Sequence, residues 1–160
     1  VLYANTYREK YKEFLKIDFP RVPFTADYKL FEKISKLGEQ LVDLHLLKPK
    51  AIGASIAKFN GKNGNKIEKP RYEEKQKRVY INDGQYFEGV EPEVWNYHIG
   101  GYQVLHKWLK DRKGRSLAAE DVKHYCHIVT ALAKTIAVQG EVDGVYERME
   151  KVGIVNPVDN

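Results

Sequence analysis

Apolar residues spaced three and four positions apart predict two helices within residues 1–50. The first covers about residues 4–16 and carries a stripe made of Tyr3, Tyr7, Tyr11, Phe14 and Leu15. The second covers about residues 25–47, with Thr25 as its N-cap and an apolar seam made of Leu30, Ile34, Leu37, Leu41 and Leu44. Prolines separate the two helices and follow the second, because proline lacks the amide donor that a helix needs.

Between residues 52 and 87 the pattern changes to short extended runs separated by turn residues. The runs are Ile52–Phe59, Lys66–Tyr72 and Arg78–Asn82. Asn-Gly pairs at residues 60–61 and 63–64 adopt positive φ angles readily, so we expect the first two runs to pair as a hairpin. With Asp83-Gly84 as a further turn, the segment predicts a small antiparallel sheet of about three to four strands.

The last third of the chain returns to helical spacing. It predicts a short helix over 92–97, a break at Gly100-Gly101, and a helix over 103–110 that Gly114 closes. A long amphipathic helix follows from the cap Ser116 to about Val138, where Gly140 marks its end, and a final helix covers about 142–151. The pattern as a whole predicts an α+β, mostly helical fold in one domain over 1–160: helical over 1–50, a β-hairpin region over 51–87, and helical over 88–153.

Positive charge is concentrated in two segments. The 160 residues carry a net charge of +5. Residues 58–78 contain eight lysines and arginines against three acidic residues, and residues 107–115 contain five against one. Lysine and arginine clusters neutralise phosphates, and aromatic residues interleaved with the second cluster offer stacking surfaces. This combination favours nucleic acid as the partner.

Several classes of function lack support in the sequence. No stretch approaches the roughly 20 apolar residues of a membrane span, so we expect a soluble cytoplasmic protein. The single cysteine, Cys126, is expected to pack as a small hydrophobe, and His124 and His127 lack a further ligand at a diagnostic spacing. Phosphate-loop, nucleophile-elbow and zinc-protease motifs are absent from the sequence, so it offers no support for these classes of enzyme, and we expect no metal and no cofactor.

Two alternatives to nucleic-acid binding stay open. Asp43 followed by Glu73-Glu74-Lys75 loosely matches the acidic residues of a magnesium-dependent nuclease, although such triples arise often in a chain that is 31% charged. A protein-docking or coupling domain would instead leave the Leu30–Leu44 seam partly exposed.

Three blocks of sequence resemble the C-terminal specificity region of type ISP restriction-modification enzymes. They are residues 7–24 (YREKYKEFLKIDFPRVPF), residues 37–47 (LGEQLVDLHLL), and VYIN at 79–82 leading through QYFEGV at 85–90 to residues 95–115. These enzymes join nuclease, ATP-driven translocase, adenine-N6 methyltransferase and target-recognition parts in one polypeptide. The resemblance implies that the chain is a C-terminal fragment of a larger protein, non-catalytic in itself, that recognises double-stranded DNA beside upstream methyltransferase and nuclease/translocase parts.

The resemblance also divides the candidate site into two roles. The block over 95–115 is shared by family members with different targets, so its cations are expected to hold phosphates: Lys107, Lys110, Arg112, Lys113 and Arg115. The loops within 58–77 lie outside the matching blocks and are better placed to read bases. Short amides and arginine pair with base edges, so the expected groove contacts are Asn60, Asn63, Asn65, Lys66 and Arg71.

Overall fold

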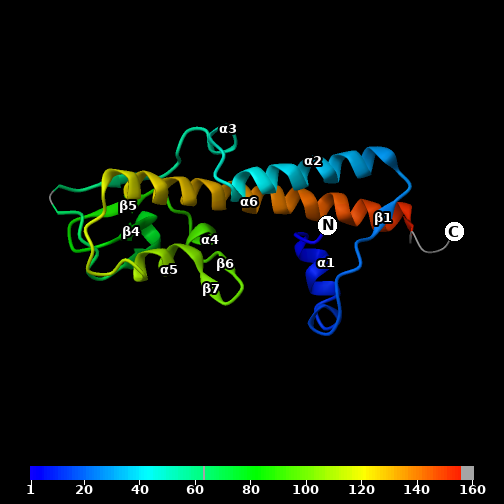
Figure 1. Ribbon diagram of the computed structural model, residues 1–160, viewed down its shortest axis with the longest axis horizontal. Coiled ribbons are helices and arrows are strands. Elements are labelled where there is room, and N and C mark those ends of the chain that lie inside the picture. The colour runs from blue at the N-terminus through cyan, green and yellow to red at the C-terminus, as the bar shows by residue number, and fades with distance from the viewer. Residues whose placement is uncertain (63, 156–160) are drawn as a thin grey trace. The chain divides into compact units, whose positions relative to one another are not determined.

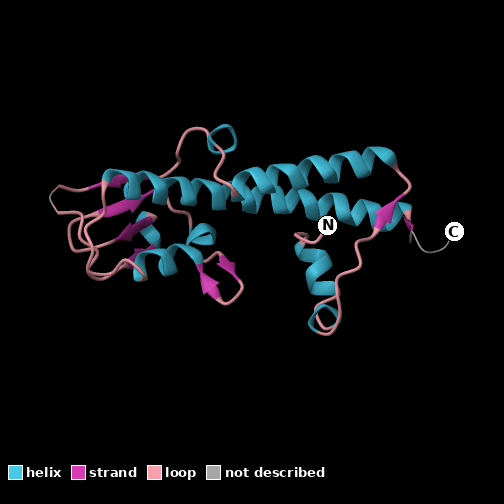
Figure 2. Cartoon of the chain, viewed as in Figure 1, coloured by secondary structure: helices cyan, strands magenta, loops and turns pink. Residues whose placement is uncertain are grey.

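The chain folds into two compact units in a computed structural model that describes residues 1–62 and 64–155. Unit 1 comprises residues 1–46 and 135–160, and unit 2 comprises residues 47–134. Helices dominate, and the described strands pair antiparallel in one four-stranded and two two-stranded sheets (Figure 2). The predicted α+β, mostly helical fold is confirmed. None of the helices among the described residues is both long and apolar enough to cross a membrane.

Unit 1 is built on two long helices that run in opposite directions. These are α2 (Tyr28–His45) and the C-terminal part of α6 (Ala119–Val152). The strand before α2, β1 (Phe24–Thr25), pairs with the strand after α6, β8 (Ile154–Val155), so the start of one helix lies beside the end of the other (Figure 1). The seam of α2 is buried at Ile34, Leu37, Leu41 and Leu44, as its spacing predicts.

The N-cap of α2 is Asp27, so the prediction of Thr25 is wrong. The Asp27 carboxylate accepts hydrogen bonds from the backbone N–H groups of Lys29 and Leu30, at 2.8 and 3.2 Å. The hydroxyl of Thr25 instead accepts a hydrogen bond from the Asp27 N–H. Both residue types suit an N-cap, and the pairing of Thr25 in β1 leaves Asp27 as the residue at the helix start.

The first helix is shorter than its aromatic stripe predicts. α1 (Asn5–Lys10) is followed by turns and a separate 3-10 turn, η1 (Phe14–Lys16). Tyr7 is buried edge-on against Tyr146 of α6, with ring centroids 5.6 Å apart, whereas Phe14 is exposed. Since only part of the stripe has a packing partner, the helix is not carried through to residue 16.

α6 continues for 34 residues, so the predicted end at Gly140 and the separate helix over 142–151 are wrong. Gly140 and Gly144 both lie on its exposed face, while Val138, Val142 and Tyr146 are buried on the other. Each glycine costs about 1 kcal/mol relative to alanine, and one buried valine or tyrosine offsets that cost. The predicted cap Ser116 is also wrong, because the carboxylate of Asp121 accepts a hydrogen bond from the N–H of Ala118, the residue before the helix.

Unit 2 contains the four-stranded sheet, with strand order β2-β5-β4-β3. The strands are β2 (Lys58–Asn60), β3 (Arg71–Glu73), β4 (Arg78–Tyr80) and β5 (Tyr86–Glu88). A 3-10 turn, η2 (Glu74–Gln76), joins β3 to β4. β2 pairs with β5 and β3 pairs with β4, so the predicted hairpin between the first two extended runs is wrong. The Asp83-Gly84 turn does connect two paired strands, β4 and β5, as predicted.

Short helices and α6 cover one face of this sheet. α3 (Pro49–Ile52) precedes it; α4 (Pro92–Trp95), the hairpin β6 (His98–Ile99) and β7 (Tyr102–Gln103), and α5 (Val104–Lys110) follow it. Phe87 of β5 packs on Tyr125 of α6 with ring centroids 4.3 Å apart, and Tyr72 of β3 stacks on Trp95 at 5.1 Å. This inner face forms the apolar core of unit 2 and leaves the opposite face to solvent.

Candidate nucleic-acid interface

The outer face of the four-stranded sheet carries charged, aromatic and amide side chains. Strand residues alternate between faces, and the pairing register places the following residues on the face opposite Phe87 and Val79: Lys58, Asn60, Arg71, Glu73, Arg78, Tyr80, Tyr86 and Glu88. All of them are exposed or half-buried. The sheet therefore presents a polar platform beside a buried core.

Two arginines on this platform lie over tyrosine rings. The guanidinium carbon of Arg71 lies 3.9 Å from the centroid of the Tyr80 ring, and that of Arg78 lies 4.2 Å from the Tyr86 ring. The two tyrosines contact each other at 5.1 Å. Stacking of this kind fixes the plane of a guanidinium group and leaves its N–H edge available.

The basic end of α5 is only partly available for a partner. Lys107 is paired with Asp111, and Arg112 lies 3.8 Å from the Trp108 ring centroid and donates a hydrogen bond to the Trp108 carbonyl. Lys110, Lys113 and Arg115 are exposed, and none of the three makes an ion pair with a described residue. Of the five predicted phosphate contacts, these three are the most accessible.

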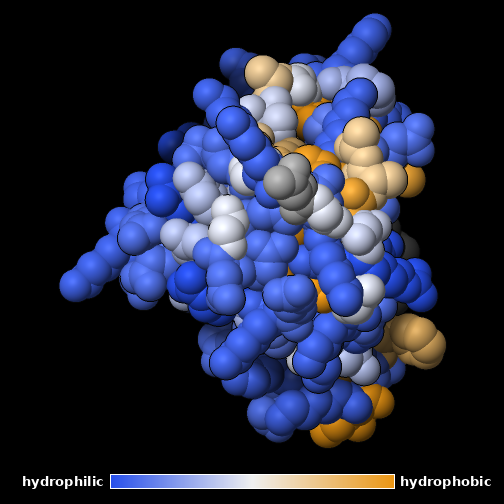
Figure 3. Space-filling view, turned by 90° about the vertical axis from the view of Figure 1, so that its left-hand side faces the viewer, coloured by the Kyte–Doolittle hydropathy of each residue, from blue (hydrophilic) through white to orange (hydrophobic). Residues whose placement is uncertain are grey.

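A backbone bridge brings the two basic segments together. Lys66 pairs antiparallel with Ser116, the N–H of Ile67 donates to the Arg115 carbonyl at 2.9 Å, and the Ile67 carbonyl accepts from the N–H of Gly114 at 2.7 Å. The exposed cations Lys66, Lys113 and Arg115 therefore lie on two chain segments that these hydrogen bonds hold side by side. Figure 3 views the molecule from the left-hand side of Figure 1, and hydrophilic side chains cover most of the face it shows.

The predicted groove contacts fall into different surroundings. Arg71 and Lys66 are exposed, whereas the Asn65 side chain donates to the Leu117 carbonyl and accepts from the Gln85 amide at 2.8 Å. These bonds give Asn65 a part in holding the loop. The Nδ2 atom of Asn60 is buried without a hydrogen-bond partner in the described structure, and Asn63 lies outside the described residues.

Two hollows flank α5. One, of about 410 Å³, is lined by residues that include His98, His106 and Lys110. The other, of about 350 Å³, is lined by residues that include Ile99 and Trp108. Tyr102, Lys107 and Asp111 line both, so positive and negative groups meet there. These shallow sites add hydrogen-bonding groups to the basic end of α5.

The structure gives the nuclease alternative no support. Asp43 lies in α2 of unit 1, whereas Glu73 and Glu74 lie in β3 and η2 of unit 2. Among residues 1–62 and 64–155, no group of three or more histidine, cysteine or acidic side chains could hold a metal ion. Burial raises the pKa of the Cys126 thiol to about 11, so this thiol is protonated at neutral pH and is a poor nucleophile.

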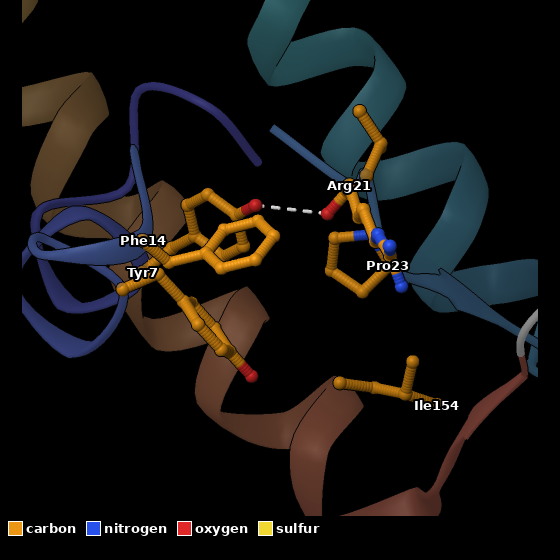
Figure 4. Close-up of a pocket in the computed structure, with 7 residues that line it drawn as sticks. Tyr7, Phe14, Arg21, Pro23 and Ile154 are labelled. Atoms are coloured by element: carbon orange, nitrogen blue, oxygen red, sulfur yellow. Dashed lines mark hydrogen bonds between the residues drawn. The ribbon is translucent and has the colours of Figure 1, made fainter. Parts of the chain in front are cut away.

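Unit 1 contains an aromatic pocket of about 430 Å³ (Figure 4). Its walls come from α1, η1, the segment before β1, and β8, and the labelled residues are Tyr7, Phe14, Arg21, Pro23 and Ile154. The Tyr7 hydroxyl donates to the Arg21 carbonyl at 2.8 Å, which ties α1 to the segment before β1. The pocket is mostly apolar and aromatic, unlike the charged surface of unit 2.

Comparison with known proteins identifies the family. No curated protein matches the chain. The profile of one protein family, the Type ISP C-terminal specificity domain, matches residues 1–139. The chain belongs to this family. The membership confirms the resemblance that the three sequence blocks indicate.

Solved structures share the fold of this specificity domain. An ATP-dependent Type ISP restriction-modification enzyme, LlaBIII, bound to DNA, matches with a TM-score of 0.57 at 15% identity over 96% of the present chain. A nuclease-deletion mutant of the Type ISP enzyme LlaGI in complex with a DNA substrate mimic matches with a TM-score of 0.58 at 16% identity over 92% of the present chain. A DrdV–DNA complex matches with a TM-score of 0.57 at 19% identity over 93% of the present chain. The specificity domain spans 11, 13 and 17% of these three chains.

Sequence reasoning missed part of the outer-face site. Arg78, Tyr80 and Tyr86 were not singled out, although Arg78 and Tyr80 are two residues apart in an extended run and therefore share a face. This alternation in the sequence could have indicated that Arg78 and Tyr80 lie on the same face of the sheet. The cross-strand stacking itself depends on the register between β3, β4 and β5, which the sequence does not state.

Proposed function

We propose that this specificity domain is the DNA-recognition part of a longer restriction-modification polypeptide and is not itself catalytic. It would bind double-stranded DNA through unit 2 and require no cofactor. The other parts of that polypeptide would supply methyltransferase and nuclease/translocase activities. Family membership supports this proposal, and so do the three structural neighbours, each of which is a complex with DNA or a DNA substrate mimic.

One observation supports the DNA-binding surface most directly: the backbone bridge between Lys66 and Ser116. It joins a segment of the first basic cluster to the end of the second, with Lys66, Lys113 and Arg115 exposed. Cations on adjoining chain segments can contact successive phosphates, and each such contact releases a counterion. In this proposal the three side chains grip the backbone of the duplex.

A double charge reversal tests the phosphate grip. Changing Lys113→Glu together with Arg115→Glu should weaken binding to a mixed-sequence duplex by about tenfold or more. It should also reduce the magnitude of the slope of log affinity against log salt concentration by roughly 2, since about one counterion is released per phosphate contact. Fluorescence anisotropy over a series of salt concentrations measures both quantities.

The matched control changes the same net charge elsewhere. Lys29 and Lys33 are exposed on α2 of unit 1, so Lys29→Glu with Lys33→Glu should leave the salt slope near that of the parent chain. Equal losses in the two double variants would mean that only net charge matters. A parent chain that binds no duplex even at low salt would contradict the proposed function itself.

The Leu30–Leu44 seam, which a docking domain would leave partly exposed, is mostly buried. A second function, protein docking, is instead favoured by exposed apolar side chains that lie outside this seam. Among the described residues, those in unit 2 are few: Ile56, Ile99 and Tyr102. Unit 1 has many more, including Ile17 and Phe19, which are 87% and 89% exposed. Large apolar side chains exposed in this number are typical of surfaces that contact another protein. We propose that unit 1 docks on a neighbouring part of the longer polypeptide.

Hydrogen exchange tests the docking surface. Backbone amides over residues 14–24 should exchange several-fold more slowly in the longer polypeptide than in the chain alone, because docking excludes water and suppresses local opening. Backbone amides over residues 110–115 of unit 2 serve as the internal comparison, measured without DNA, and should exchange at the same rates in both contexts. Identical exchange over residues 14–24 in both contexts would leave unit 1 without a docking role.

A further inference from the structure

Two arginines on the outer face of the sheet share one kind of stacking but differ in their other partners. Arg78 is half-buried, donates to the Gln76 side chain at 3.2 Å and lies 3.7 Å from the Glu88 carboxylate. Arg71 is exposed and makes no hydrogen bond or ion pair with a described side chain. The guanidinium donors of Arg71 are therefore held in place by Tyr80 but remain unused.

We propose that Arg71 reads a guanine in the major groove of the target DNA, with Tyr80 as the residue that positions it. This inference rests on the proposed DNA-binding function and names the base-reading surface within it. Guanine presents two acceptors, O6 and N7, side by side in the major groove, and the planar guanidinium fork of arginine matches them with two parallel hydrogen bonds. A guanidinium group already fixed against a ring loses little freedom on forming them.

The charges around Arg71 favour a base edge over a phosphate. Glu73 lies two residues further along β3 on the same face, whereas Glu88 lies two strands away in β5 and within 3.7 Å of Arg78. Carboxylates repel the phosphate backbone, but they accept hydrogen bonds from the amino group of cytosine. Arg71 and Glu73 therefore suit contacts with base edges inside the groove. Lys66, Lys113 and Arg115 supply the positive charge that contacts the phosphate backbone of the DNA.

The dimensions of the hairpin formed by β3 and β4 fit this position. β3 is an edge strand, and the major groove admits a two-stranded ribbon. Alternate residues of a strand are about 7 Å apart, because each residue advances about 3.4 Å. Base pairs are also stacked about 3.4 Å apart. Because the groove winds around the axis, its path per base pair is longer than this rise, so a strand that follows it would place Arg71 and Glu73 opposite base pairs about one to two steps apart, a guanine and a cytosine respectively.

A charge-conserving substitution separates base reading from phosphate binding. Arg71→Lys keeps the positive charge but removes the fork. In a selection from duplexes with a randomised centre, the parent chain should enrich a G·C pair at one position, and Arg71→Lys should lower the preference at that position by about tenfold while leaving the salt slope unchanged. Arg78→Lys is the matched comparison, since the Arg78 donors are engaged by Gln76 and Glu88, and it should retain the preference.

Substitutions at Tyr80 test the positioning role. Tyr80→Phe keeps the ring under Arg71 and should retain the preference for the G·C pair, whereas Tyr80→Leu should lower it with the salt slope unchanged. Circular dichroism checks that both variants are folded. A lower preference in both would contradict positioning by the ring.

The other outcomes overturn the assignment in distinct ways. Uniformly weaker binding of Arg71→Lys to all duplexes with a lower salt slope would make Arg71 a phosphate contact. Unchanged selection by Arg71→Lys would remove the outer face from the base-reading surface, while binding to duplex DNA by the parent would leave the proposed function standing. Absence of any duplex binding by the parent would instead overturn the proposed function, and this inference with it.

Discussion

Replacing Phe87 with alanine is expected to destabilise unit 2 by about 3–5 kcal/mol, the range for deletion of a buried phenylalanine side chain. Phe87 is fully buried, and its ring contacts Tyr125 of α6 at 4.3 Å and Phe59 of β2 at 4.8 Å between centroids. The substitution removes the side chain that joins the sheet to α6. It leaves a cavity between rigid partners that cannot fully collapse.

Urea denaturation followed by circular dichroism measures this loss. Phe19→Ala serves as the matched control, because Phe19 is 89% exposed and its deletion should change the free energy of unfolding by no more than about 0.5 kcal/mol. Similar losses for the two variants would contradict the assigned core. Phe87→Ala should also weaken DNA binding, since the outer face depends on the sheet that Phe87 anchors.

Replacing Gly89 with alanine is expected to cost about 2 kcal/mol or more. Gly89 has a φ of +80°, a region that is unfavourable for a residue with a Cβ atom. A Cβ atom there would lie 2.7 Å from the carbonyl oxygen of Ile56, which belongs to the backbone just before β2. Because the obstacle is main chain, relief would require β2 to move away from β5.

Gly84 provides the comparison for this substitution. It lies in the turn between β4 and β5, and an added Cβ atom would meet nothing within 4 Å. Gly84→Ala should therefore be close to neutral in thermal unfolding, while Gly89→Ala lowers the midpoint. A Gly89→Ala variant as stable as the parent would mean that β2 does not approach β5 as closely as the structure has it.

The parts of the fold that follow from local pattern were predictable. The seam from Leu30 to Leu44 has a helical period over four turns, and the helix exists with that face buried. Strand pairing was not predictable in the same way. β2 pairs with β5 across residues 61–85, whereas turn chemistry at Asn60-Gly61 pointed to a partner next in sequence. Long-range register outweighed the local signal.

Helix ends illustrate the same limit. Gly140 is a typical helix terminator by residue type, but burial of Val138 and Val142 on either side carries α6 through it. Thr25 and Asp27 are both good N-caps, and the choice depended on the pairing of β1 with β8, more than a hundred residues away. Tertiary contacts decided both cases.

The candidate site was predictable as composition but not as arrangement. Charge counts located both basic segments, and the cations at Lys66, Lys113 and Arg115 are exposed. Their adjacency depends on hydrogen bonds between Ile67 and residues 114–115, which no periodicity indicates. Likewise, only the side-chain geometry shows that Arg78 has hydrogen-bond and ion-pair partners whereas the donors of Arg71 are unused. Whether the predicted residues contact DNA stays a prediction.

The bridge between Lys66 and Ser116 links affinity to conformational stability. In an unfolded chain, the two basic segments would be separated by some fifty residues and would meet only transiently. A duplex that engages both segments at once therefore binds the native chain more tightly than the unfolded one. By mass action, occupancy by such a polyanion shifts the folding equilibrium of unit 2 toward the native state.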